Sequence, residues 1–158
     1  MTILRSERTT ILLTVLIALA LIGLAFFVRE RGVECPHQPY ITLEGERISV
    51  LLATTSQAQE KGLSGHAPLG EGEGMLFEFN DKSMRAFWMK DMLFPLDIIW
   101  LDEGLRVLGV VHNARPESYP EIFPSSASMR YALEVSAGVA TRYNIATGST
   151  AVFSLCEN

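Results

Sequence analysis

The first strong pattern along the chain is an unbroken apolar stretch near its start. Residues 9–28 (TTILLTVLIALALIGLAFFV) carry no charged side chain. As a helix, this stretch would span about 30 Å, the thickness of the hydrocarbon core of a bilayer. A helix that packs on the core of a soluble domain would need a polar face, and this stretch has none. The pattern therefore predicts a transmembrane helix over residues 9–28, after a short tail of residues 1–8.

A signal peptide that is later removed is the alternative for the same stretch. The apolar region of a signal peptide usually has about 7–15 residues and ends at a small-x-small cleavage site. Here the apolar run is longer, and its small-x-small triplet, Ala18-Leu19-Ala20, lies inside it. The charged residues Arg29-Glu30-Arg31 follow the run directly. We therefore favour an uncleaved anchor at the cell membrane.

Arginines on both sides of the apolar stretch leave its orientation nearly balanced. Arg5 and Arg8 precede it, Arg29 and Arg31 follow it, and the positive-inside rule gives a tie. The free amino terminus adds positive charge at the first end and favours a cytoplasmic N-terminus. The domain after the helix is then expected on the extracytoplasmic side, periplasmic or on the outer face.

The two cysteines of the chain give a second indication of the compartment. Cys35 follows the apolar stretch closely and Cys156 lies near the end of the chain. Because the ends of a domain often lie close together, these two thiols could form a bridge. Such a bridge would add about 4–5 kcal/mol of stability in the chain-entropy model and would persist outside the cytosol. Two unrelated thiols are the alternative.

After a linker of residues 29–39, residues 40–158 read as one small β-rich domain. Strands are predicted where β-branched and aliphatic residues cluster or alternate with polar ones. Leu96–Leu101 is apolar on both faces apart from Asp97, which predicts a central, fully buried strand. The turn Asp102-Glu103-Gly104 then predicts a hairpin. The full set of predicted strands is Arg47–Thr55, Met75–Phe79, Arg85–Met89, Leu96–Leu101, Leu105–His112, Arg130–Val135 and Thr150–Leu155.

Short helices and loops are predicted between these strands. Ser56-Gln57-Ala58-Gln59 has the form of a capping box, and Gly62 can end the helix that it starts. Ser136 can cap a second helix that runs to about Tyr143. A turn is predicted at Asn80–Ser83 and a long proline-containing loop at Asn113–Ser128. The expected fold is mainly β with two short helices, a small barrel or a curled, mostly antiparallel sheet.

The charge of the chain narrows the choice of partners. Without Arg5, Glu7 and Arg8, which precede the apolar stretch, 11 basic and 17 acidic residues remain, a net charge of −6. Nucleic-acid binding needs a basic stripe, so it is not expected, and neither is docking on anionic lipid. The charges are scattered, and a solvated surface explains them.

Several segments of the chain carry distinctive motifs: Lys61-Gly62-Leu63, Gly72–Phe79, Phe87-Trp88-Met89-Lys90-Asp91-Met92, Pro95–Asp102, Arg130–Val135 and Gly138–Gly148. These motifs resemble the family named domain of unknown function 192 (DUF192). They lie between Ile48 and Phe153, and the stretch from Phe87 to Asp102 is the most specific. Ser64 and His66 stand where the family typically has methionine and arginine, and Ser149 where it has aspartate. The resemblance implies a mainly β domain, often secreted or membrane-anchored, and implies no reaction.

Asp97 is the most informative polar residue, because a carboxylate within an apolar strand loses hydration unless it is paired. One hypothesis makes it a polarised carboxylate at the base of a cleft, with Lys90 or Arg85 as its partner. The other makes it structural, accepting backbone hydrogen bonds from the Asp91–Pro95 turn. We favour the structural role.

Trp88, Lys90, Asp91 and Trp100 complete the candidate cluster around Asp97. Alternation along the strand predicts that Trp88 and Lys90 share one face. A tryptophan beside a lysine and a carboxylate could form the wall of a sugar or peptide site. An ordinary core tryptophan covered by a lysine stem is the alternative, and the favoured one.

No cofactor or metal site is indicated by the sequence. His37, His66 and His112 are isolated, without the spacing of metal ligands. The serines Ser125, Ser126 and Ser128 lack the context of a nucleophile. The loop Gly70–Gly74 is acidic and would repel phosphate.

Two hypotheses about function remain. The first is a non-catalytic binding or assembly module that is tethered to the membrane outside the cytoplasm and contacts an envelope component or membrane protein. The second is an enzyme that acts on cell-envelope glycan or peptide, with Asp97 and Asp91 as carboxylates and Lys90 as electrostatic support. We favour the module.

Overall fold

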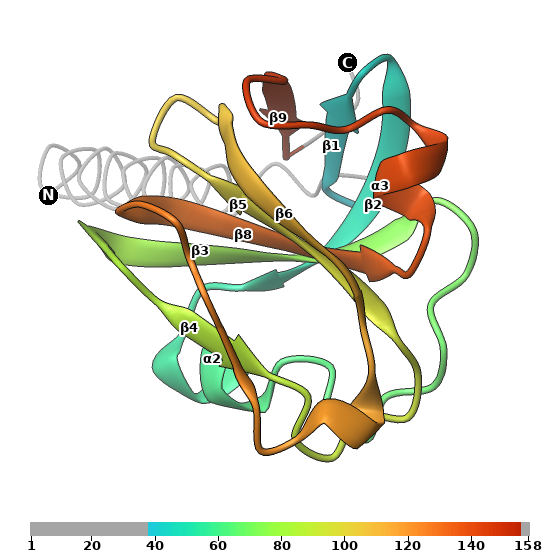
Figure 1. Cartoon of the computed structure of the whole chain (residues 1–158). Coiled ribbons are helices and arrows are strands. Elements are labelled where there is room, and N and C mark those ends of the chain that lie inside the picture. The colour runs from blue at the N-terminus through green and yellow to red at the C-terminus, as the bar shows by residue number, and fades with distance from the viewer. Residues whose placement is uncertain (1–37, 156–158) are drawn as a thin grey trace, which may run out of the picture. The chain divides into compact units, whose positions relative to one another are not determined.

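A curled seven-stranded sheet organises residues 38–155, the part of the chain that the structure describes (Figure 1). In this computed structural model the strand order is β6-β5-β8-β3-β2-β1-β9, and a separate two-stranded sheet pairs β4 with β7. The strands are β1 Tyr40–Leu43, β2 Glu46–Ala53, β3 Glu73–Ser83, β4 Ala86–Trp88, β5 Leu96–Leu101, β6 Val107–Ala114, β7 Ile122–Pro124, β8 Met129–Ser136 and β9 Ala151–Ser154. The prediction of a mainly β fold with a curled sheet is confirmed.

The apolar stretch at residues 9–28 and both cysteines lie outside the described residues. Within residues 38–155, no helix has the length and hydrophobicity needed to cross a bilayer.

One helical crossover joins the only parallel pair of strands in this part of the chain, β2 and β3. Parallel neighbours need such a connection, and α2 (Ser56–Lys61) supplies it. The side chain of Thr55, not of Ser56, caps this helix by accepting the N–H of Ala58 at 3.2 Å. The predicted capping box at Ser56 is therefore wrong by one residue. Gly62 ends the helix as predicted, at a φ of 49°.

The central strand β5 is buried along its whole length, as predicted. It lies between β6 and β8, and its two faces enter two different core clusters. Ile99 and Leu101 belong to the first cluster, while Ile98 and Trp100 belong to the second. Because both faces of the sheet are covered at β5, a polar side chain on a strand next to β5 can also be buried.

The β5–β6 hairpin confirms the prediction of a turn at Asp102-Glu103-Gly104. The Asp102 carboxylate accepts the N–H groups of Gly104 at 2.8 Å and Arg106 at 2.9 Å. Leu105 takes a positive φ of 60°, and the returning strand β6 begins at Val107.

Other predicted loops contain regular structure. The turn predicted at Asn80–Ser83 is wrong, because β3 continues to Ser83 through a register shift against β8. The predicted loop Asn113–Ser128 contains a 3-10 helix, η1 (Pro116–Ser118), and strand β7, which pairs with β4. Strand β1, which no pattern predicted, pairs with both β2 and β9.

The second predicted helix exists, with a different cap. Helix α3 spans Val139–Arg142, and Ser136 does not cap it. Its N-cap residue is Gly138, which has no side chain to offer. The carboxylate of Asp97 accepts the N–H groups of Gly138 and Ala140 instead. The cap prediction at Ser136 is wrong because the hydrogen-bond acceptor comes from a strand distant in sequence.

Candidate functional site

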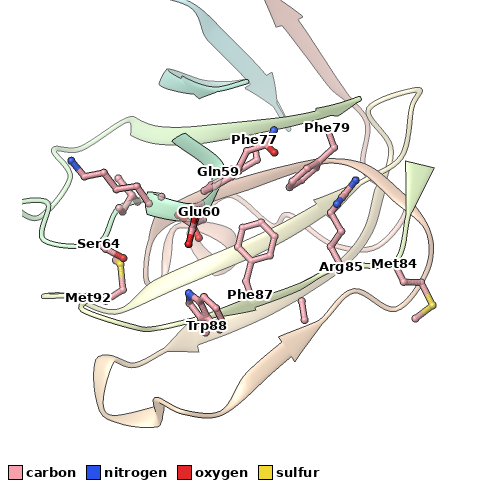
Figure 2. A pocket seen from close by; sticks show the side chains of 15 residues that line it. Gln59, Glu60, Ser64, Phe77, Phe79, Met84, Arg85, Phe87, Trp88 and Met92 are labelled. Atoms are coloured by element: carbon pink, nitrogen blue, oxygen red, sulfur yellow. The ribbon is translucent and has the colours of Figure 1, made fainter. Parts of the chain in front are cut away.

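A pocket of about 400 Å³ lies between α2 and strands β3 and β4 (Figure 2). Its walls combine aromatic, apolar and charged side chains from segments that are far apart in the sequence. Met92 and Met84 lie toward opposite ends of the pocket in the close view (Figure 2). The lining residues are Gln59, Glu60, Lys61, Gly62, Leu63, Ser64, Phe77, Phe79, Met84, Arg85, Ala86, Phe87, Trp88, Met92 and Glu134.

Packed aromatic rings form the apolar part of the pocket. The Phe87 ring contacts the Phe77 ring edge to face, with centroids 5.0 Å apart, and lies 6.4 Å from Phe79. Behind it, the Trp100 ring lies 4.9 Å from Phe87 and is only 2% exposed. Trp88 stands at the rim with 49% of its surface exposed. The rings that line the pocket are therefore held in place by a buried ring beneath them.

A buried carboxyl group, Glu134, also lines this pocket. Glu134 is 5% exposed and sits on β8, between Met75 of β3 and Ile98 of β5. Its Oε2 atom has no hydrogen-bond partner in the described part of the chain. Burial raises the pKa of Glu134 to about 8, because removal from water disfavours the charged form. The group is therefore largely protonated at pH 7.

The end of α2 lies close to this carboxyl. A Cβ atom added at Gly62 would be 3.4 Å from Cζ of Phe77 and 4.0 Å from Oε2 of Glu134. Glycine at this position lets the helix end at a positive φ and leaves the space above the carboxyl free. The C-cap of α2 thus helps to shape the pocket.

Arg85 brings a cation to the same pocket. Its Cζ lies 3.9 Å from the centroid of the Phe79 ring, and its guanidinium pairs with Asp81. The backbone N–H of Arg85 donates to Oγ of Ser125, which is buried. The arginine is therefore fixed at the pocket by stacking, by an ion pair and by its own backbone.

Asp97 is separated from this pocket by the sheet. It is completely buried and lies on the face of β5 that carries Ile99 and Leu101, opposite to Trp100. Its Oδ1 accepts the N–H of Asn113 at 2.8 Å, and its Oδ2 accepts those of Gly138 and Ala140 at 2.8 and 2.9 Å. These donors differ from the Asp91–Pro95 turn that we expected. Neither Lys90 nor Arg85 is hydrogen-bonded to Asp97.

The other members of the predicted cluster do not converge. Trp88 reaches the pocket rim, whereas Trp100 is buried behind Phe87. Lys90 and Asp91 are exposed. Their backbone carbonyls bind the loop that follows α2: the carbonyl oxygen of Lys90 accepts a hydrogen bond from the Ser64 hydroxyl, and that of Asp91 accepts one from the N–H of Gly65. Among the described residues, no group of three His, Cys, Asp or Glu side chains could hold a metal ion.

Reasoning from the sequence missed Glu134. Alternation along the predicted strand Arg130–Val135 puts Tyr131, Leu133 and Val135 on the inner face and Glu134 on the outer face. In the structure, Gly62 at the end of α2 lies near this carboxyl and aromatic rings line the same pocket, which no pattern within β8 reveals. A carboxylate that alternates with apolar residues in a strand is an ordinary solvent-facing pattern, so the signal lies in the tertiary arrangement.

Comparison with known proteins identifies the family. A family model described as DUF192, "Uncharacterized ACR", matches residues 40–153, which is more than half of the chain. The chain belongs to the DUF192 family. The match includes Glu134, Trp88 and the rest of the pocket described above. No curated protein matches the chain.

Two solved structures are similar to this DUF192 chain. A protein of unknown function from Novosphingobium aromaticivorans DSM 12444 is 33% identical, with a TM-score of 0.68 over 72% of this chain and 83% of that one. A putative transcription regulator from Sinorhizobium meliloti 1021 is 26% identical, with a TM-score of 0.70 over 77% of this chain and 98% of that one. Both support the curled β fold.

Proposed function

We propose that this chain is a non-catalytic binding module, tethered to the membrane outside the cytoplasm, whose ligand enters the pocket between α2, β3 and β4. The observation that carries the proposal is the unpartnered carboxyl of Glu134 in a pocket with aromatic walls. A polar group that is buried without a partner costs about 1–3 kcal/mol, and a ligand that supplies the partner recovers this free energy. Pockets of about 300–1,000 Å³ are typical of small-ligand sites.

Binding explains the arrangement better than catalysis at Asp97. An enzyme that used Asp97 would need substrate at this carboxylate, yet the group is completely buried and engaged by three backbone donors. In the pocket itself, the Ser64 hydroxyl donates to the carbonyl of Lys90, so it is not activated by a base. Glycan- or peptide-directed catalysis remains the alternative, and turnover of such a substrate would favour it.

The tether and the compartment belong to the same proposal. Residues 9–28 act as the anchor, and a bridge between Cys35 and Cys156 closes the ends of the domain. Cell fractionation tests the anchor. The full-length chain should sediment with membranes and resist extraction by carbonate. A chain without residues 1–28 should remain in the supernatant. Recovery of the intact full-length chain in the soluble fraction without detergent would contradict the tether.

Tryptophan fluorescence tests the pocket, because the chain has two tryptophans in contrasting settings. Trp88 is half exposed at the pocket rim, and Trp100 is buried. The full-length chain in detergent micelles is titrated with benzyl alcohol, benzylamine and phenylacetate, one neutral, one cationic and one anionic probe. We expect saturable emission changes with at least one probe, and their loss in Trp88→Phe. Absence of a saturable change with all three probes would overturn the proposed site.

A further inference from the structure

The charge lining the pocket indicates which ligand it accepts. Glu60 and Lys61 of α2 carry opposite charges, and Arg85 is neutralised by Asp81. Strand β3 contributes the uncharged rings of Phe77 and Phe79, and β5 contributes no lining residue. Glu60 and Lys61 are exposed to solvent, whereas the carboxyl of Glu134 is buried and forms no ion pair within the described part of the chain.

The wall of the pocket that contains this carboxyl also includes several aromatic rings. Cations bind over such faces, with about 2 kcal/mol or more when both are removed from water. Arg85 already illustrates this preference, since its guanidinium lies 3.9 Å from the Phe79 ring centroid. Phe77, Phe87 and Trp88 line the same pocket as this carboxyl, and none of these three rings is covered by a cation in the described part of the chain.

We propose that the pocket recognises a protonated primary amine on a short apolar stem, with Glu134 as its charge partner and Phe77, Phe87 and Trp88 as its walls. This inference rests on the proposed function and names the ligand class of that site. The ammonium group supplies N–H donors to the carboxyl, including the unpartnered Oε2. The apolar stem of the amine packs on the rings of the pocket wall. An amino group of an envelope peptide, at a lysine side chain or a free amino terminus, has this chemistry.

Proton release gives the proposal a distinctive signature. Because burial raises the pKa of Glu134 to about 8, the empty pocket holds a proton on this carboxyl at pH 7. An ammonium group beside it favours the ionised form and expels that proton. Binding of the amine should therefore release about one proton for each site, whereas binding of a neutral probe should release none.

The experiment compares benzylamine with benzyl alcohol, which share a ring and differ in charge. Calorimetric titration of the full-length chain in micelles at pH 7, in phosphate and in Tris buffer, gives both the affinity and the number of protons released. We expect benzylamine to bind at least tenfold more tightly than benzyl alcohol. Glu134→Gln should abolish both this preference for benzylamine and the proton release. Glu121→Gln, an exposed acid outside the pocket, should change neither affinity.

The outcomes separate the two proposals. Equal affinities for the two probes, unaltered by Glu134→Gln, would leave a pocket without a preference for amines and overturn this inference alone. Binding of neither probe, nor of phenylacetate, would overturn the pocket itself. If Glu134→Gln fails to fold, proton release by the wild-type protein still tests the inference. Binding of benzylamine without proton release would contradict a charge partner whose pKa is raised.

Discussion

The carboxylate of Asp97 accepts the backbone N–H of Gly138, 41 residues later, at a distance of 2.8 Å. The same Oδ2 atom also accepts the N–H of Ala140, and Oδ1 accepts that of Asn113. Helix α3 has four residues, and its N-cap residue is a glycine without a side chain to accept these N–H groups. The distant carboxylate of Asp97 therefore replaces the capping side chain. Asp97 thus joins β5, β6 and α3 from within the core.

Replacement of Asp97 by alanine should destabilise the domain by about 1–3 kcal/mol, because three backbone N–H groups lose their acceptor and that of Ala140 is buried. Chemical denaturation of the full-length chain measures this change. Asp91→Asn is the matched control, since Asp91 is exposed and asparagine tolerates its positive φ. The control should change the stability by no more than about 0.5 kcal/mol. An Asp97→Ala variant as stable as the wild type would contradict the structural role.

The sequence predicted the strands far better than it predicted the site. Fully apolar β5 and its hairpin were predicted correctly because each depends on local pattern and turn chemistry. The pocket depends on tertiary packing: Glu134 of β8 is buried near Gly62, where α2 ends, and that glycine is distant from it in sequence. The cap of α3 was missed for the same reason, since its acceptor, Asp97, lies on another strand.

Glu134 should make the stability of the domain fall as the pH rises. The pKa of Glu134 is about 8 in the folded chain and near 4.5 in the unfolded chain. Between these values the folded state binds more protons, so the free energy of unfolding decreases with pH. The loss should be a few kcal/mol between about pH 5 and pH 8. Glu60, Lys61 and Arg85 line the same pocket, and burial is the cause of the raised pKa of Glu134.

Glu134→Gln provides the comparison for this pH dependence. The amide keeps the shape of the side chain and has no charge to bury. Its free energy of unfolding, followed by urea denaturation from pH 5 to pH 8, should therefore fall less than that of the wild type, and the variant should be the more stable protein at pH 8. Parallel curves for the two proteins would show that the carboxyl is not protonated in the folded chain.

Truncation of the two tryptophans should affect different properties, stability for Trp100 and ligand binding for Trp88. Trp100 is buried against Phe87, so Trp100→Ala should cost about 3–5 kcal/mol of stability. Trp88 is half exposed, so Trp88→Ala should cost less than about 1 kcal/mol while it weakens benzylamine binding severalfold. Thermal denaturation and calorimetric titration measure the two effects. Unchanged affinity in Trp88→Ala would remove this ring from the site.

A bridge between Cys35 and Cys156 would make the domain sensitive to reductant. The wild-type chain purified without reductant should unfold at a higher temperature than the same chain in dithiothreitol. Cys35→Ser should abolish that difference and match the reduced wild type. Equal melting temperatures of the wild type with and without dithiothreitol would count against the bridge.

Methionine methyl groups locate the ligand most directly. Met84 and Met92 line the pocket, while Met129 is completely buried and does not line it. In the full-length chain labelled with ¹³C-methyl methionine, saturating benzylamine should shift the Met84 and Met92 resonances and leave that of Met129 in place. The account of a binding pocket at Glu134 is contradicted if benzylamine leaves both Met84 and Met92 unshifted.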